Sequence, residues 1–189
     1  IGQDQCAQYD KRDEEAFDRG VALLGHSYSV YLVSTLEHLC KGVKEARPAF
    51  AMRITRRVDF SASHLCAIPS LSQEENQAIY GDGANPHGHG HNYVLEVTLE
   101  GEPDPVTGMV FDLKELKSIL QREILDVMDH RHLNQEVPPF DRIVPTVENV
   151  SREIWKRLWP KLNLSNARLH QVRLYETEDL FVDYSGEPA

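Results

Sequence analysis

Cysteine is scarce in this chain, and long apolar stretches are absent. The three cysteines, Cys6, Cys40 and Cys66, are widely spaced, form no CxxC pair and predict no disulfide framework. This pattern favours a reducing cytoplasmic location. No stretch approaches the roughly 18 to 20 consecutive apolar residues that a membrane-spanning helix needs, so we expect no membrane span.

Basic residues are also fewer than acidic ones. The chain has 20 basic and 30 acidic residues, which gives a formal net charge of -10. This balance argues against a nucleic-acid partner and against binding to an anionic membrane surface. A small molecule that carries phosphate remains compatible with it, because a few local cations can hold such a ligand within an acidic protein.

The chain divides into a short N-terminal extension and one larger domain. Its 189 residues, of which 41% are hydrophobic, can bury one sizeable core. From Asp13 to Val43 the apolar positions recur mostly every three or four residues, which favours a helix, although Tyr28 to Val33 also suits a strand. Arg47-Pro48 then interrupts the pattern. We therefore expect a helical extension over residues 1–48 and a domain over residues 49–189.

The larger domain alternates between strand-like and helix-like segments. Ser72 resembles a helix cap within a loop, and Asp112 and Thr146 resemble caps of two longer helices. The first of these helices has an apolar stripe that begins at Leu113, and Pro160 is expected to end the second. The pattern predicts an α+β fold with a four-stranded antiparallel sheet. We expect strands over 52–61, 92–100, 171–176 and 180–184, and helices over 112–128 and 146–159.

A histidine motif directly precedes the second expected strand. The segment from Pro86 to Tyr93 reads Pro-His-Gly-His-Gly-His-Asn-Tyr. Residues two apart in a strand point to the same side, so His89 and His91 present two imidazoles together. A catalytic zinc site usually has three protein ligands, and His64, at the end of the first strand-like run, is the best third candidate. The alternative interpretation is a solvated turn that binds no metal.

Six motifs in order along the chain resemble those of the 6-pyruvoyl-tetrahydropterin synthase family. The resemblance spans about residues 49–187 and leaves only the extension outside. It implies the tunnelling fold, or T-fold, in which the sheets of several subunits join into a barrel and two trimers form a hexamer. The motifs occupy residues 59–64, 88–93, 104–110, 128–134, 146–150 and 175–178.

The resemblance implies a metal site and a set of residues that act on a pterin. It assigns zinc to His64, His89 and His91, in agreement with the spacing argument. The zinc would hold the hydroxyls of the pterin side chain and, as a Lewis acid, favour the loss of protons from the adjacent carbons.

The resemblance also implies roles for five further residues. Asp129 and His130 correspond to the family's proton-transferring pair, and Glu176 to the glutamate that grips the pterin ring. Thr146 and Glu148 correspond to pocket residues. Simpler interpretations remain, because His130 could cap a helix C-terminus, and Thr146 and Glu148 could serve as ordinary groups of a helix N-terminus.

One position departs from the family pattern. Animal-type members carry a proton-abstracting cysteine six residues before His-Gly-His, where this chain has Gly83. The bacterial-type spacing gives Asn85, and neither residue can accept a proton. Asp82, His87 and Cys66 are nearby groups that could substitute, although Cys66 also suits a small buried hydrophobic residue.

Three functions follow from these observations. The first is a zinc-dependent lyase that eliminates triphosphate from 7,8-dihydroneopterin triphosphate. The second uses the same substrate but forms 6-carboxy-tetrahydropterin for deazapurine (queuosine) synthesis. The third is a pterin-binding protein without turnover, which the missing cysteine suggests. The first is favoured.

Overall fold

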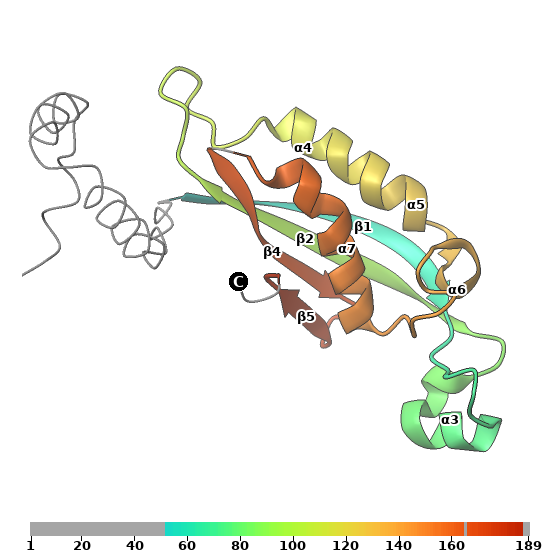
Figure 1. The fold of residues 1–189 in the computed structure, drawn as a ribbon. Coiled ribbons are helices and arrows are strands. Elements are labelled where there is room, and N and C mark those ends of the chain that lie inside the picture. The colour runs from blue at the N-terminus through green and yellow to red at the C-terminus, as the bar shows by residue number, and fades with distance from the viewer. Residues whose placement is uncertain (1–51, 165, 187–189) are drawn as a thin grey trace, which may run out of the picture. The chain divides into compact units, whose positions relative to one another are not determined.

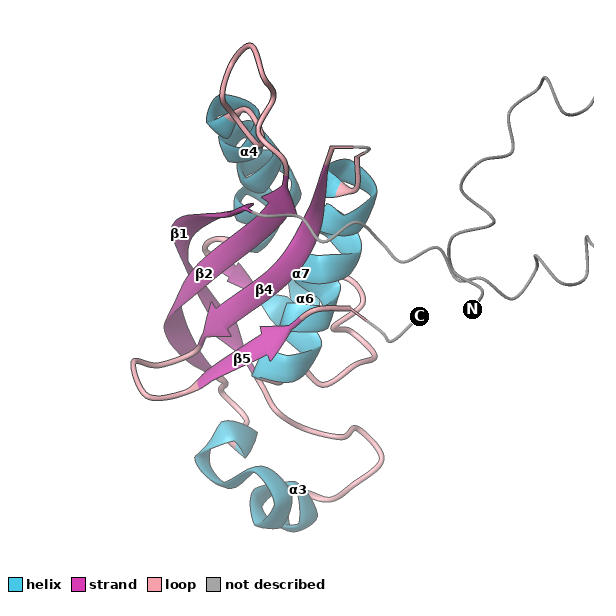
Figure 2. Ribbon diagram, turned by 90° about the vertical axis from the view of Figure 1, so that its left-hand side faces the viewer, coloured by secondary structure: helices cyan, strands magenta, loops and turns pink. Residues whose placement is uncertain are grey.

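The computed structural model describes residues 52–164 and 166–186, which form one mixed sheet with helices on one face (Figures 1 and 2). The helix expected within residues 1–48 lies outside the described residues. The sheet has the strand order β3-β1-β2-β4-β5. Its strands are β1 (Met52–His64), β2 (His89–Gly101), β3 (Arg131–His132), β4 (Ala167–Tyr175) and β5 (Phe181–Tyr184).

The two expected long helices are present and cover the sheet. The first consists of α4 (Leu113–Leu120), a π-helical turn (Gln121–Leu125) and α5 (Asp126–Met128), and the second is α7 (Val147–Leu162). The Asp112 and Thr146 side chains cap these helices by accepting hydrogen bonds from backbone amides in the first turn. The loop between β1 and β2 contains α3 (Gln73–Tyr80), which begins with a complete capping box of Ser72 and Glu75. Within the described residues, no helix combines the length and apolar character needed to cross a membrane.

The two faces of the sheet differ in character. Phe60, Tyr93 and Leu95 are buried on the face that the helices cover, where Phe60 and Tyr93 stack with ring centroids 5.0 Å apart. On the opposite face, the Thr55 and Thr98 hydroxyls are hydrogen-bonded at 2.8 Å. Further along that face, Glu100 forms ion pairs with Arg53 and Arg168. The alternation predicted from the sequence therefore separates an apolar core from a polar outer face.

The prediction of four antiparallel strands was wrong in one detail. The two-residue strand β3 adds a fifth strand, which pairs in parallel with Ala62 and Ser63 of β1. So short a strand carries no alternation in the sequence. It forms because the chain leaving α5 is held against β1, where the His130 amide donates a hydrogen bond to the Ser61 carbonyl.

Several element boundaries and one core residue also differ from the prediction. The helix α7 continues through Pro160 to Leu162, because the fully buried Leu162 side chain packs into the core and retains the last turn. β4 begins at Ala167 rather than at residue 171. A β-bulge at Thr98/Leu99 shifts the pairing of β2 with β4 by one residue, so buried side chains stay on the core face on both sides of the bulge. Leu113 is 49% exposed and lies outside the core.

We predict that replacing Leu116 with alanine destabilises the domain far more than replacing Leu113, although both belong to the same apolar stripe. Leu116 is 0% exposed, so Leu116→Ala leaves a cavity and should lower the free energy of unfolding by about 2 to 5 kcal/mol. Leu113→Ala is the matched control and should change it by about 0.5 kcal/mol or less. Urea unfolding measures both. Equal losses would contradict the packing of α4 described above.

Candidate metal centre

Three histidines from two paired strands meet at one end of the sheet. His64 is the last residue of β1 and lies opposite His89, the first residue of β2. His91 lies two residues further along β2, on the same face as His89. One potential ligand atom from each imidazole lies within 4.8 Å of those of the other two. The spacing of the motif and the antiparallel register thus bring together the three residues proposed from the sequence.

The burial of these imidazoles and the surroundings of their ring nitrogens fit a bound metal ion. His64 is 1% exposed. His64 Nε2, His89 Nδ1 and His91 Nε2 are all buried and have no hydrogen-bond partner among the described residues. Burial, above all other causes, lowers the pKa of His64 to about 4 and lowers that of His91 as well. Neutral imidazoles with unshared nitrogen lone pairs are the form that binds divalent transition metals.

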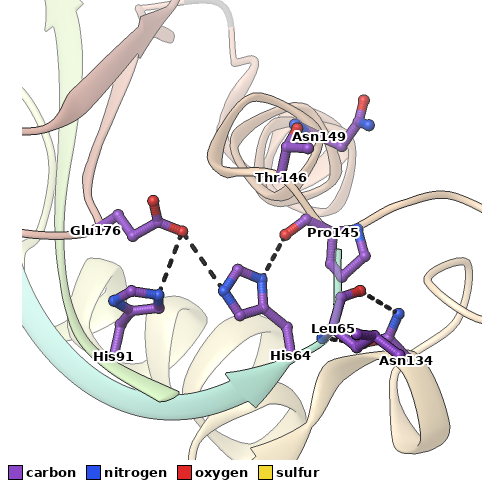
Figure 3. Close-up of polar contacts among 8 residues, drawn as sticks. All are labelled: His64, Leu65, His91, Asn134, Pro145, Thr146, Asn149 and Glu176. Carbon is purple, nitrogen blue, oxygen red and sulfur yellow. Dashed lines mark hydrogen bonds and ion pairs between the residues drawn. The ribbon is translucent and has the colours of Figure 1, made fainter. Parts of the chain in front are cut away.

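A backbone carbonyl fixes the orientation of the His64 ring. His64 Nδ1 lies 2.7 Å from the Pro145 carbonyl oxygen (Figure 3). Because a carbonyl can only accept, Nδ1 carries the proton and Nε2 keeps its lone pair. The adjacent Leu65 is held through its backbone by the Asn134 side chain, which accepts from the Leu65 amide and donates to the Leu65 carbonyl. The ring is therefore orientated before any metal binds.

The helix α7 begins directly beside this metal centre. Pro145, which contacts His64, precedes Thr146, the N-cap residue whose hydroxyl accepts from the Asn149 amide. Glu148 is exposed in the first turn of α7. The structure therefore brings the predicted pocket residues Thr146 and Glu148 to the same end of the sheet as the histidines. Both also fill the ordinary positions of a helix N-terminus, so their binding role stays a prediction.

Glu176 approaches the histidines from the end of β4. Its Oε1 lies 3.6 Å from His64 Nε2 and 3.7 Å from His91 Nε2 (Figure 3). Its side chain is 14% exposed. Burial and, next, the negative charge of Glu176 raise the pKa values of Tyr93 and Cys66, the latter to about 11. A largely buried carboxylate thus faces the open side of the histidine cluster.

Asp129 and His130 form a pair that does not belong to the histidine cluster. Asp129 Oδ1 accepts a hydrogen bond from the Ser61 amide, and Asp129 Oδ2 lies 3.7 Å from His130 Nε2. His130 is strongly exposed and has a positive φ of 56°, the left-handed conformation that often follows a helix. Together with His91, it lines a polar cavity of about 490 Å³. The geometry is compatible both with a helix-end residue and with a proton-transfer group.

Two residues that hold the site were not proposed from the sequence. The backbone carbonyl of Pro145 fixes the His64 ring, and the side chain of Asn134 holds the backbone of Leu65. Asn134 lies within one of the family motifs, but nothing in the motif predicts its partner. Pro145 directly precedes a predicted helix cap, and its contact with His64 depends on where the packing of α7 on β4 and β5 places the start of that helix.

Comparison with known proteins places the chain in a family. The model of the family described as "6-pyruvoyl tetrahydropterin synthase" matches residues 53–187. This chain belongs to that family. The 6-pyruvoyl tetrahydrobiopterin synthase of Homo sapiens is 44% identical over 135 residues, which cover 71% of this chain and 92% of the human protein. The 6-carboxy-5,6,7,8-tetrahydropterin synthase of Rickettsia typhi is 26% identical and covers 70% of this chain and 99% of its own.

A solved structure supports the same membership and shows the fold. The 6-pyruvoyl tetrahydropterin synthase of Caenorhabditis elegans matches with a TM-score of 0.68 and 38% identity, covering 72% of this chain and 96% of that one. The α+β domain is thus the T-fold that the sequence predicted, with the additional short strand β3.

Gly83, the position at which the resemblance implies a cysteine in animal-type members, lies beside the candidate metal centre. A Cβ atom at Gly83 would stand 3.8 Å from His89 Cε1 and 3.6 Å from Cys66 Cβ, both ordinary contact distances. The Gly83 carbonyl accepts a hydrogen bond from the Cys66 amide. A side chain would therefore fit here, next to His89, and this chain provides none.

The possible substitutes for the missing cysteine differ in their surroundings. Cys66 is buried, and its raised pKa of about 11 keeps the thiol protonated near neutral pH, which makes it a poor proton acceptor. Asp82 and His87 are exposed, and both belong to the segment that connects α3 to β2. Of the three candidates, Asp82 and His87 are therefore the ones open to solvent.

We predict that His64→Ala, His89→Ala and His91→Ala each abolish tight binding of a divalent transition metal, because each removes one of three converging nitrogen ligands. Metal content after dialysis, measured by plasma mass spectrometry, is the readout. His87→Ala is the matched control, because His87 belongs to the same motif but is exposed. Full metal occupancy in any two of the three variants would contradict the assignment.

Proposed function

We propose that this chain is a zinc-dependent lyase that acts on 7,8-dihydroneopterin triphosphate and eliminates triphosphate, as a 6-pyruvoyl-tetrahydropterin synthase does. The observation that carries the proposal is the cluster of three converging histidines, of which His64 is buried, beside the Glu176 carboxylate. The match of the family model and the pterin synthases among the relatives support it. A cytoplasmic location is part of the same proposal, supported by three cysteines without paired spacing.

The residues of the site have complementary roles in this proposal. His64, His89 and His91 hold zinc, which when bound supplies Lewis-acid polarisation of the hydroxyl-bearing side chain of the pterin. The Glu176 carboxylate accepts two hydrogen bonds from the amino-pyrimidinone edge of the ring. Thr146 and Glu148, at the start of α7, are the proposed pocket residues. Binding and orientation are thus assigned to β4 and α7.

Asp129 and His130 are the proposed proton-transfer pair. The Ser61 amide holds the Asp129 carboxylate, which in turn faces the His130 ring. A carboxylate beside an imidazole can orientate the ring, and general-base catalysis requires such an orientation. The exposed His130 ring and the cavity it shares with His91 support access to a substrate held at the metal centre.

Two alternative functions have specific support. Formation of 6-carboxy-tetrahydropterin is supported by the relative from Rickettsia typhi. Pterin binding without turnover is supported by Gly83, which leaves the position beside His89 without a proton acceptor. Incubation of the purified protein with 7,8-dihydroneopterin triphosphate, with the products identified by mass spectrometry, distinguishes all three functions.

We predict that Gly83→Cys increases formation of 6-pyruvoyl-tetrahydropterin by about 10² to 10⁴, the usual contribution of a general base. The space around Gly83 accommodates the new side chain, and the thiol would lie next to His89. Gly83→Ser is the matched control, because it fills similar space with a hydroxyl that does not ionise near neutral pH.

A wild-type protein that already turns over efficiently, with no gain in Gly83→Cys, would show that another group is the base. Asp82→Ala, His87→Ala and Cys66→Ala, tested singly, should then reveal one large loss of turnover with pterin affinity retained. No loss in any of them would assign the elimination to Asp129 and His130 alone.

A homo-hexamer built from two trimers is the proposed assembly. Within the described residues β5 pairs only with β4, and the apolar side chains Leu180 and Phe181 at this edge are 47% and 44% exposed. In the part of the chain that the structure describes, most of β1 also has no strand on its outer side, because β3 pairs only with Ala62 and Ser63. Such free edges favour pairing with further copies of the chain.

We predict a hexamer in analytical ultracentrifugation at micromolar concentration. Joining the sheets edge to edge would pair the free backbone groups of β1 and β5 and bury the apolar side chains of β5. Phe181→Glu should shift the distribution towards smaller species, whereas Glu178→Lys, in the exposed turn before β5, should not. A wild-type monomer at that concentration would contradict the proposal.

A further inference from the structure

A hollow lies on the exposed surface of the segment that runs from α4 through the π-helical turn into α5 (Figure 1). Its volume is about 430 Å³, and three of its six lining residues are cations. The lining shares no residue with those assigned above to a metal or a pterin, and α4 follows the end of β2 opposite to His89. We call this feature the α4 hollow. It is lined by Lys114, Lys117, Ser118, Gln121, Arg122 and Asp126.

The cations of the α4 hollow have few partners of opposite charge. The Lys117 ammonium forms no ion pair within the part of the chain that the structure describes. The Lys114 ammonium lies 4.0 Å from Asp112 Oδ2, and its side chain is 93% exposed. Arg122 pairs through Nε with Glu123 at 2.8 Å, which leaves the two terminal nitrogens of its guanidinium directed to solvent. Because like charges on one helix face destabilise the helix, this row costs stability unless an anion joins it.

The one acidic side chain in the lining is engaged by a neutral group. Gln121 Nε2 donates a hydrogen bond to Asp126 Oδ1 at 2.7 Å. The π-helical turn brings the two residues together, because the Asp126 amide donates to the Gln121 carbonyl five residues earlier. Turns of this kind are frequent at functional sites. Asp126 is therefore held away from the cations, and the lining keeps an excess of positive charge.

A chain of phosphates fits this row better than a single small anion does. Lys114 and Arg122 are eight residues apart, so the row extends about 12 Å along the helix axis. A single phosphate reaches only part of such a row, whereas a chain of phosphates can contact all three cations. The lysines supply point charges, and the arginine supplies a planar fork that matches phosphate oxygens. The net charge of -10 makes this row a local exception in an acidic protein.

We propose that the α4 hollow is a second binding site of this protein, separate from the metal centre, for an anion that carries a chain of phosphates. Inorganic triphosphate, which the proposed reaction would release, and nucleoside triphosphates share this chemistry. Binding at the hollow is additional to the proposed function and does not depend on it.

Isothermal titration calorimetry of the metal-loaded full chain with inorganic triphosphate tests the proposal. Binding should weaken roughly 2- to 5-fold in each of Lys114→Ala, Lys117→Ala and Arg122→Ala, the usual worth of an exposed ion pair, and should disappear in the triple variant. Lys117→Arg keeps the charge and should keep the binding. Lys161→Ala removes an exposed lysine of α7 that does not line the hollow, so it is the matched control and should change nothing.

Further titrations locate the anion and identify its source. His64→Ala should bind triphosphate as tightly as the wild type, because the α4 hollow is separate from the metal centre. Orthophosphate should bind more weakly than triphosphate. Binding of both ATP and inorganic triphosphate would show that the phosphate chain alone is recognised, whereas binding of inorganic triphosphate without ATP would identify the free anion as the ligand.

Several results would overturn the proposal. These are no binding of triphosphate, equal binding by the wild type and the triple variant, or loss of binding in His64→Ala. Equal affinity for orthophosphate would contradict the recognition of a phosphate chain. A poly-glutamate peptide that binds the wild type when triphosphate does not would assign the hollow to an acidic protein partner instead.

Discussion

The antiparallel register of β1 and β2 is the constraint on which the rest of the site depends. It sets His64 opposite His89 and leaves His91 on the same face, so three candidate ligands come from two strand ends without a dedicated loop. A shift of one residue would turn His64 to the polar face. The stacked rings of Phe60 and Tyr93 and the hydrogen-bonded pair of Thr55 and Thr98 specify this register from opposite faces of the sheet. Core packing and ligand geometry are therefore set by the same pairing.

The covering helices connect this register to the chemistry. The Pro145 carbonyl, at the start of α7, determines which nitrogen of His64 keeps its lone pair. The end of α5 delivers Asp129 to the Ser61 amide, three residues before His64. Glu176 arrives from β4 on the other side. The start of α7 and the end of α5 are thus attached to β1 by contacts that also stabilise the fold, so mutations at these contacts should affect stability and metal binding together.

Local patterns in the sequence predicted the elements and the metal cluster, but not the contacts between distant segments. The spacing of His89 and His91 in a strand was sufficient to pair them, and the caps at Ser72, Asp112 and Thr146 located three helix starts. The continuation of α7 beyond Pro160 depends on the burial of Leu162, and β3 depends on the docking of α5 against β1. Neither leaves a periodic signal. The approach of Glu176 to two imidazoles likewise follows from sheet order, which the sequence pattern left open.

Zinc-edge X-ray absorption of the protein as purified, with and without 7,8-dihydroneopterin, is the most direct test of a pterin-processing centre built on these three histidines. The account predicts imidazole scattering from three histidines together with oxygen ligation at about 2.0 to 2.2 Å, and an altered oxygen shell when the pterin is added. A protein that binds no metal, or a spectrum with a sulfur ligand near 2.3 Å, would contradict it.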